Sequence, residues 1–257
     1  MKLTKNLKAI LKNNELTVGS WLSIPSPATA EIMAQAGFPW LVIDLEHSVI
    51  DYETMQSMIV AIENNGSIPL VRLSSKDSPQ IKRVLDAGAH GIIAPMINNA
   101  NDAKKIVSAV KYPPIGNRGV GLARAQGYGM KFESYKEYFN DYSIIICQIE
   151  HKSAVDNIEE IVATKGIDGI IIGPYDLSGS YGIPGKLSSD ELVEAEKIIL
   201  EAAVRYNIPS GIHIVHRDKS ELINKINDGF RIIAYGVDQL FLAKSGNDAL
   251  QDINGQL

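Results

Sequence analysis

The feature that most constrains the fold is an alternation of short apolar runs with segments of helical periodicity, repeated along almost the entire chain. The runs predict strands because they are rich in Val, Ile and Leu and have the lengths of strands rather than helices. The expected strands are residues 18–23 (VGSWLS), 40–46 (WLVIDLE), 69–74 (PLVRLS), 91–97 (GIIAPMI), 144–150 (IIICQIE), 169–174 (GIIIGP), 210–215 (SGIHIV) and 231–237 (RIIAYGV). Strands that are apolar on both faces belong in a parallel sheet covered by helices.

The segments between these runs carry the start and stop signals of helices. In residues 51–63 the apolar side chains fall on one helical face. Ser26-Pro27 and Ser78-Pro79 predict an N-cap followed by a proline in the first turn, and residues 188–191 (SSDE) predict a capping box. A glycine that suits a left-handed helix end precedes several of the strands, namely Gly37, Gly88, Gly166 and Gly229.

Eight such units over roughly 240 residues are typical of a (β/α)₈ TIM barrel. A doubly wound sheet is the rival fold, but no G-x-G-x-x-G motif follows the first expected strand. The chain has 257 residues and 45% hydrophobic residues, enough for one large core, and no change of composition indicates a linker. We therefore expect a single α/β domain over residues 1–257, in which a short amphipathic helix in residues 1–16 precedes the barrel.

Charge and cysteine content exclude several classes of function. The net charge is −5 and its signs are interspersed, so nucleic acid is not an expected partner. No apolar run is long enough to span a membrane, and the lysines spread through residues 1–16 do not fit a signal peptide. We expect a cytoplasmic protein. The single cysteine, Cys147, excludes an intramolecular disulfide and a cysteine-based zinc site.

Polar side chains gather where the expected strands end, which in this fold is where active sites lie. Strand alternation places Gln148 on the face of Glu150 and turns Cys147 toward the helices, as a small buried hydrophobic residue. The strand-end groups are Asp44, Glu46 and His47 after the second strand, Arg72 in the third, Glu150 in the fifth, Asp176 after the sixth, His213 in the seventh and Asp238 after the eighth.

Glu150 and Asp176 come from neighbouring strands and together suit a divalent cation. Two carboxylates plus waters match Mg²⁺ or Mn²⁺, which keep coordination positions open for substrate oxygens. The alternative is that one carboxylate pairs with Arg72 and the other caps a helix. The spacing of the residues does not choose between these interpretations.

His47 with Asp44 resembles an acid–base histidine oriented by a carboxylate, although a histidine at a strand end can also be purely structural. Arg72 needs an anionic partner, either a substrate carboxylate or Glu46. His213 lines the pocket or is a satisfied core histidine.

The remaining histidines and Asp238 have expected structural roles. His90 lies at the bottom of the barrel, His151 and His216 in solvated loops, and Asp238 caps the last helix. No lysine lies within a strand near its C-terminal end, which disfavours a Schiff-base mechanism. Residues 111–143 are too long for a passive turn and suggest a lid over the site.

Taken together, the motifs resemble those of the HpcH/HpaI aldolase family. They are IDLEH at 43–47, VR at 71–72, APM at 94–96, RGVG at 118–121, QIE at 148–150 and GPYDLS at 173–178. The match covers about residues 19–242 with the motifs in the expected order. Members of this family are class II pyruvate aldolases acting on 4-hydroxy-2-oxo acids, including 4-hydroxy-2-oxoheptanedioate and 2-dehydro-3-deoxyglucarate.

The resemblance assigns roles to individual residues. It implies that Glu150 and Asp176 bind a divalent metal (Mg²⁺, Mn²⁺ or Co²⁺), that His47 with Asp44 is the acid–base group, and that Arg72 binds pyruvate. Residues expected along the substrate are Gln148, Gly173, Pro174, Tyr175 and His213. It also implies a homohexamer in which the last helix packs on a neighbouring barrel and Asp86 approaches the neighbour's site. His151 and His213 depart from the family pattern and leave the aldehyde open.

The expected activity is therefore metal-dependent retro-aldol cleavage, and its reverse, yielding pyruvate and an aldehyde. One alternative is a carbon–carbon lyase acting on a CoA thioester, like citrate and malyl-CoA lyases, although no extra basic surface for CoA is visible. The other is a barrel that binds 2-oxo acids without turnover.

Overall fold

The computed structural model describes residues 2–216 and 218–254 as a closed barrel of eight parallel strands in chain order, β1 to β8. The strands are β1 (Thr17–Leu22), β2 (Trp40–Asp44), β3 (Ile68–Arg72), β4 (Gly91–Ala94), β5 (Ile144–Ile149), β6 (Gly169–Ile172), β7 (Ser210–Ile214) and β8 (Ile232–Val237). All eight expected strands are present. They end up to three residues earlier than expected because the chain leaves the sheet to build the loops of the barrel mouth.

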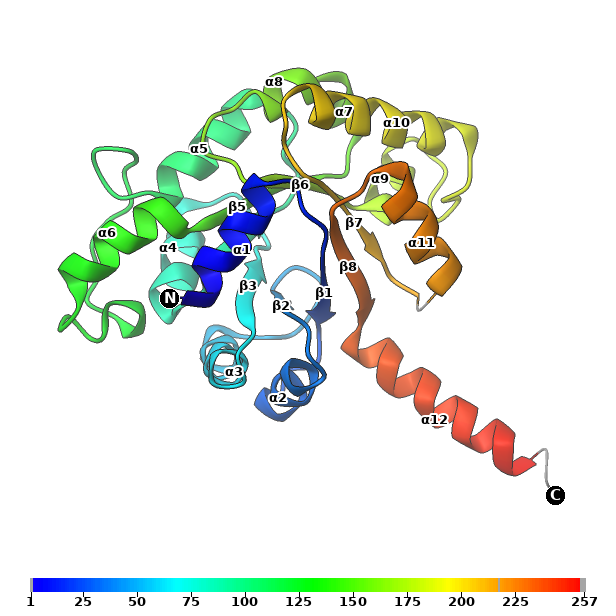
Figure 1. Ribbon diagram of the computed structural model, residues 1–257, viewed down its shortest axis with the longest axis horizontal. Helices are drawn as coiled ribbons and strands as arrows, with labels where there is room; N and C mark the ends of the chain where they lie inside the picture. Colours follow the sequence, from blue (N-terminus) through cyan, green and yellow to red (C-terminus); the bar gives the residue numbers. More distant parts are fainter. Residues whose placement is uncertain (1, 217, 255–257) are drawn as a thin grey trace.

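Helices surround the barrel (Figure 1). They are α1 (Lys2–Lys12), α2 (Pro27–Gln35), α3 (Tyr52–Asn64), α4 (Ser78–Ala87), α5 (Ala100–Val110), the 3₁₀ turn η1 (Arg124–Gln126), α6 (Phe132–Tyr142), α7 (Lys152–Asp156), α8 (Ile158–Val162), α9 (Pro174–Ser180), α10 (Asp190–Arg205), α11 (Lys219–Asp228) and α12 (Asp238–Asn254). The TIM-barrel prediction is confirmed. No helix in the described part of the chain is long and apolar enough to cross a membrane.

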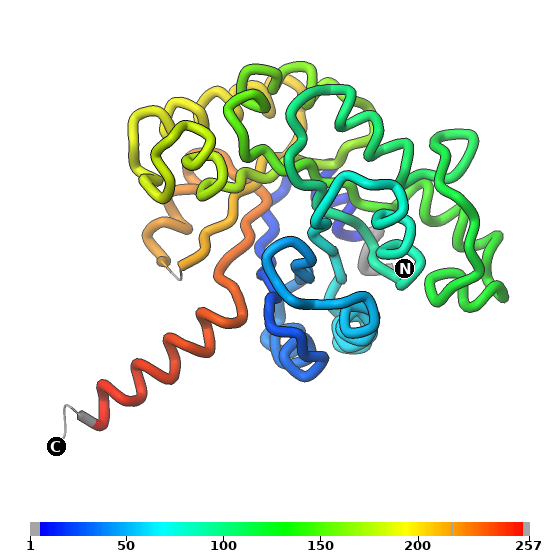
Figure 2. The backbone as a smooth tube through the Cα atoms, turned by 180° about the vertical axis from the view of Figure 1, so that it is seen from behind, coloured from blue at the N-terminus to red at the C-terminus, as the bar shows by residue number. Residues whose placement is uncertain are grey.

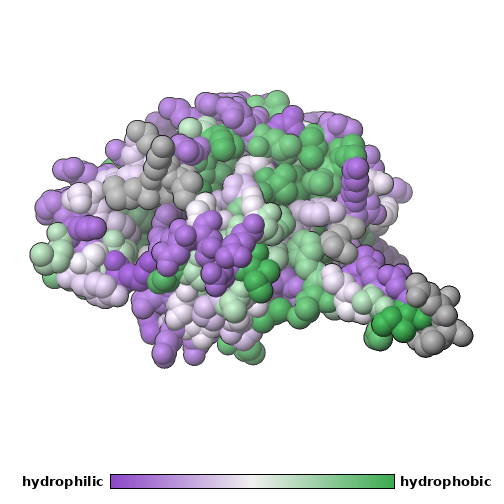
Figure 3. Space-filling model, turned by 60° about the horizontal axis from the view of Figure 1, so that its bottom comes forward, coloured by the Kyte–Doolittle hydropathy of each residue, from purple (hydrophilic) through white to green (hydrophobic). Residues whose placement is uncertain are grey.

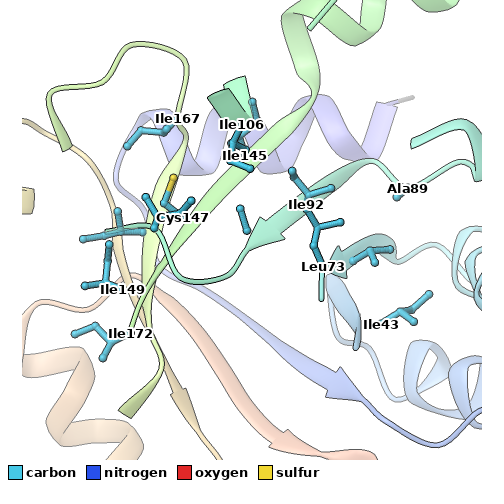
Figure 4. Close-up of a cluster of buried hydrophobic side chains, with 14 of the residues drawn as sticks. Ile43, Leu73, Ala89, Ile92, Ile106, Ile145, Cys147, Ile149, Ile167 and Ile172 are labelled. Atoms are coloured by element: carbon cyan, nitrogen blue, oxygen red, sulfur yellow. The ribbon is translucent and has the colours of Figure 1, made fainter. Parts of the chain in front are cut away.

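Alternating strand residues build two hydrophobic clusters, one inside the barrel and one between strands and helices. Ile146 belongs to the inner cluster, whereas Cys147 and Ile149 belong to the outer one (Figure 4). Burial raises the pKa of the Cys147 thiol to about 12, so this cysteine is an inert core residue, as the alternation predicts.

Helix α1 covers the end of the barrel at which the strands begin. Leu7 and Leu11 are buried in the inner cluster beside Trp40. The Trp40 ring packs so closely over Gly19 that a side chain at that position would overlap it. The amphipathic helix expected within residues 1–16 is therefore present, and it closes the bottom of the barrel.

The helix ends follow the expected signals with two corrections. Ser26 caps α2 through a hydrogen bond from the Thr29 N–H, and the four expected glycines all have positive φ. Helix α4, however, begins one residue before the expected position, with Asp77 as its N-cap. The expected capping box at 188–191 does not form, because Ser189 is the N-cap and Leu192 occupies the third helical position.

The segment 111–143 does not cover its own barrel mouth, so the expectation of a lid is wrong within this chain. Arg118 binds Asp86 at 2.6 Å, and Arg124 binds Glu63 and the carbonyl of Ala87. These partners lie at the C-terminal ends of α3 and α4, which face the bottom of the barrel. Pairing of the arginines with these residues holds the segment there.

Helix α12 projects from the body in two opposite views (Figures 1 and 2). Its base is fixed by Phe241, whose ring lies 6.3 Å from that of Phe38. Farther along, Leu242, Leu250 and Ile253 are exposed, and hydrophobic surface is visible toward the end of the helix in Figure 3.

Candidate active site

A cavity of about 200 Å³ opens at the C-terminal ends of the strands. Most of the expected site residues line it: Asp44, His47, Arg72, Gln148, Gly173, Pro174, Tyr175, Asp176 and His213. Glu150 is buried directly behind this lining, with its carboxylate against Gly173. Asp86 lies elsewhere, bound to Arg118 and Gln126 of the same chain. Among the described residues no lysine lines the cavity, in agreement with the sequence.

Arg72 and Asp44 form a two-point ion pair at the base of the cavity. The Arg72 Nε–H donates to Asp44 Oδ1 at 2.9 Å, and its Nη2 donates to Oδ2 at 2.5 Å. Both residues are buried, on adjacent strands and directly opposite in register. Burial opposes ionisation, but Arg72 and two backbone N–H groups outweigh it and hold the pKa of Asp44 below its usual value.

Asp44 also shapes the loop that carries His47. Its Oδ1 accepts hydrogen bonds from the backbone N–H of Glu46 at 2.9 Å and of His47 at 3.2 Å. The sequence suggested that Asp44 orients the imidazole directly. In the structure Asp44 instead fixes the main chain of the loop, which leaves the exposed His47 side chain at the cavity.

Glu46 is a third charge at this site. Its Oε2 lies 3.4 Å from Nη1 of Arg72, and among the described residues it has no hydrogen-bond donor. Burial raises the pKa of Glu46, and the negative charges of Glu150 and Asp44 act in the same direction. The positive charges of Arg72 and His47 lower this pKa but do not outweigh the burial. Arg72 therefore binds both neighbouring carboxylates of its own chain and keeps further N–H groups for a ligand.

Glu150 follows β5 and is held by its neighbours. Its Oε1 accepts from the Met96 N–H at 2.6 Å, and its Oε2 accepts from the Gln148 side-chain amide. A side chain at position 173 would approach Glu150 Oε2 to 2.9 Å, so glycine is needed there. Burial, with Asp176 as the main nearby anion, raises the pKa of Glu150.

The residues around Glu150 fit a divalent cation. Asp176 lies in the first turn of α9, exposed at the cavity and close enough to act on the charge of Glu150. The side-chain oxygen of Gln148 is buried without a donor among the described residues, and a cation satisfies such an oxygen. No three or more His, Cys, Asp and Glu side chains among the described residues are arranged to hold a metal ion together, so two carboxylates would leave the other positions to water and substrate.

Trp21 was not singled out from the sequence, yet its ring contacts two polar side chains of the cavity. The guanidinium carbon of Arg72 lies 5.2 Å from the centre of the Trp21 ring, and the ring of His213 stacks on Trp21 at 4.7 Å. The Trp21 Nε1–H is buried without an acceptor among the described residues. Trp21 is the aromatic residue near the end of β1.

His213 lines the cavity, as one of its two expected roles required. Its Nε2 lies 3.1 Å from the carbonyl of Gly236, which assigns the proton to Nε2. Burial lowers the pKa of His213 to about 4, so the ring is neutral at pH 7. It can therefore act as a hydrogen-bonding group but not as a cation.

Asp238 has a larger role than capping α12. One of its oxygens accepts from both the N–H and hydroxyl of Ser23, at 3.0 and 2.9 Å, and the other accepts from the Ile24 N–H at 2.9 Å. Asp238 thereby fastens the loop after β1 to the end of β8. No pattern in the sequence relates residues so far apart.

Comparison with known proteins gives a consistent result. Residues 17–244 match the family model described as HpcH/HpaI aldolase/citrate lyase. A 4-hydroxy-2-oxovalerate aldolase of Novosphingobium aromaticivorans is 38% identical over 96% of this chain and 93% of its own length. A 2-keto-3-deoxy-L-rhamnonate aldolase of Escherichia coli O6:K15:H31 (strain 536) is 39% identical over 79% of this chain and 75% of its own.

Solved structures agree with the sequence matches. The crystal structure of an HpcH/HpaI aldolase/citrate lyase family protein from Burkholderia cenocepacia J2315 superposes with a TM-score of 0.93 and 33% identity. The match covers 97% of this chain and 99% of that one.

Proposed function

Because the chain belongs to the HpcH/HpaI aldolase/citrate lyase family, we propose that it cleaves a 4-hydroxy-2-oxo acid to pyruvate and an aldehyde, and catalyses the reverse condensation. The protein is an aldolase, a carbon–carbon lyase. The observation that supports the substrate class is that the buried Arg72–Asp44 pair lines the same cavity as Asp176 and Gln148.

Arg72 recognises the acid end of the substrate. Its Nε and Nη2 are fixed by Asp44, so the remaining N–H groups of the planar fork have a set direction. A fork held in this way suits the carboxylate and 2-oxo oxygens of pyruvate. The Trp21 ring on one face of Arg72 excludes water from that side.

Glu150 and Asp176 would hold the divalent cation on which aldolases of this family depend. When bound, the cation supplies Lewis-acid polarisation of the 2-oxo group. Both carboxylates must be ionised to bind it, and ion binding offsets the cost of burying the Glu150 charge. Mg²⁺, Mn²⁺ and Co²⁺ all suit oxygen ligands of this kind.

We assign the proton transfer of the reaction to His47, whose side chain lines the cavity. It would take the proton from the 4-hydroxyl as the bond between C3 and C4 breaks and C4 becomes the aldehyde carbon. The electron pair of that bond passes toward the 2-oxo oxygen, where Arg72 stabilises the developing negative charge. Protonation at C3 then gives pyruvate.

The CoA-thioester lyase remains the second candidate, because the matched family model also includes citrate lyase. The test is to incubate the protein with pyruvate, a panel of aldehydes and Mg²⁺, Mn²⁺ or Co²⁺, with and without CoA, and to analyse the products. Condensation that needs a divalent metal and no CoA supports the proposal. A strict requirement for a CoA thioester would overturn it.

We also propose that the protein assembles as a homo-oligomer, with a hexamer as the family-based expectation. The projecting α12 exposes Leu242, Leu250 and Ile253, which a neighbouring barrel would bury. Asp86 of α4 binds Arg118 of the loop that carries the exposed Val120 and Leu122, a surface suited to approach a second copy's site.

A further inference from the structure

A second cavity adjoins the active-site cavity. It has a volume of about 450 Å³ and shares with the first the residues Pro174, Tyr175, His213 and Val215. Most of its remaining lining comes from α11, from His216 and Asp218 before that helix, from residues 187–188 just before α10, and from Glu196 within α10. Because the two cavities are adjacent at these shared residues, a substrate bound by Arg72 that extends past His213 would enter the second one.

His213 is fixed where the two cavities meet. Stacking on Trp21 and the hydrogen bond between Nε2 and the Gly236 carbonyl hold the ring in one orientation. With the proton on Nε2, the other ring nitrogen, Nδ1, is an acceptor, and it has no hydrogen bond among the described residues. A hydroxyl group of the substrate is the matching donor.

The second cavity is acidic. Its described lining holds one ammonium group, that of Lys225, and four carboxylates. The carboxylates are those of Glu196, Asp218, Glu221 and Asp228. Lys225 already pairs with Glu196. Arg217 lies outside the described residues, and one further cation would still leave an excess of negative charge.

Glu221 shows this excess most clearly. Burial raises the pKa of Glu221, and the negative charges of Asp218 and Glu196 act in the same direction. The positive charge of Lys225 opposes this effect without cancelling it. A substrate carboxylate entering here would meet like charges, and such repulsion is an effective means of discrimination. The lining of the same cavity carries the neutral hydrogen-bonding groups of Ser188, Ser220 and Asn224, which match hydroxyl groups.

We infer that the second cavity takes the aldehyde-derived end of the substrate and selects an uncharged, polyhydroxylated chain over one that ends in a carboxylate. This inference rests on the proposed function, since the reaction must first place pyruvate at Arg72. It names the substrate class that the reaction alone leaves open. His213 accepts a hydrogen bond from a hydroxyl near the reacting carbon, and Glu221 repels a terminal carboxylate.

The test compares two aldehydes of equal chain length, erythrose and 4-oxobutanoate, in condensation with pyruvate and Mn²⁺. We expect kcat/KM to be at least about tenfold higher for erythrose. Glu221→Lys should lower this ratio about tenfold or more, and Glu221→Gln by a smaller factor in the same direction. Glu194→Gln, at an exposed glutamate of α10 outside the cavity, is the matched control and should leave the ratio unchanged.

His213 is tested with butanal, which lacks the hydroxyl groups of erythrose. His213→Leu should lower kcat/KM for erythrose relative to butanal, because only erythrose loses a hydrogen bond. An equal loss for both aldehydes would overturn the role given to Nδ1.

Exchange of the pyruvate methyl protons with deuterated solvent separates failure of this inference from failure of the proposed function. If exchange occurs, three results overturn the inference alone: a preference for 4-oxobutanoate, no turnover of erythrose, or a ratio of the two kcat/KM values that no Glu221 variant changes. Absence of both exchange and condensation overturns the proposed function itself.

Discussion

Asp44→Asn changes one atom of the Arg72–Asp44 pair and tests whether this pair organises the site. Asn keeps the shape of Asp and one oxygen, which can still accept from Arg72 Nε and the backbone of the following loop. Its amide nitrogen replaces Oδ2, which now accepts from Arg72 Nη2 at 2.5 Å. Two donors then face each other, and a buried guanidinium loses its principal counter-charge.

The structure sets the size of the effect. Asp44 and Arg72 are 3% and 8% exposed, and breaking a buried pair by removing one partner costs about 3–5 kcal/mol. Glu46, 3.4 Å from Nη1, compensates part of the charge, so we expect the lower end, about 3 kcal/mol. For a domain of this size that is a fall in Tm of about 6–12 °C.

Thermal unfolding at pH 7, followed by circular dichroism, measures this difference. Glu133→Gln is the control, because Glu133 pairs with Lys136 at a similar 2.6 Å but its side chain is 74% exposed, where an ion pair contributes about 0–1 kcal/mol. The pKa of Asp44 is lowered, so the stabilisation is present above the ordinary aspartate pKa and is lost only as pH falls below about 4. If Asp44→Asn shifts Tm no more than Glu133→Gln does, the pair does not organise the site.

Three further predictions concern the metal, the acid response and the assembly. EDTA should abolish activity and Mn²⁺ or Mg²⁺ should restore it, while borohydride with pyruvate should leave the enzyme active; a trapped lysine adduct would contradict the assignment. Burial lowers the pKa of His213 to about 4 from its ordinary value of about 6.5. Between these two pH values the His213 ring is protonated in the unfolded chain but not in the folded one. Unfolding free energy should therefore fall by up to about 3 kcal/mol as pH drops from about 6.5 to 4, and His213→Gln should flatten that slope. Light scattering at micromolar concentration should report an oligomer, and a particle of one chain's mass would refute the packing of α12 on a neighbour.

The sequence predicts the barrel and most of the site because both follow from local patterns. Apolar runs identify the strands, and the carboxyl ends of parallel strands meet at one mouth, so Asp44, Arg72 and Gln148 could be grouped without coordinates. The family resemblance added roles to the same positions.

What the sequence did not reveal depends on distances between remote side chains. It could not show that Asp44 binds Arg72 rather than the His47 ring, or that Asp238 fastens the loop after β1. Trp21 was overlooked because an aromatic residue at a strand end is usually core. The lid was misplaced because the length and glycine content of residues 111–143 do not indicate which end of the barrel the segment covers.

The central claim is that Arg72, with the ion at Glu150 and Asp176, activates pyruvate, while His47 acts only on the proton of the aldol hydroxyl. Proton NMR of pyruvate in deuterated buffer, beside a cleavage assay, tests this claim most directly. In His47→Ala, methyl exchange should persist in part while cleavage falls about 10²–10⁴-fold, and in Glu150→Gln both reactions should be lost. Full cleavage by His47→Ala, or exchange that survives in Glu150→Gln, would contradict the account.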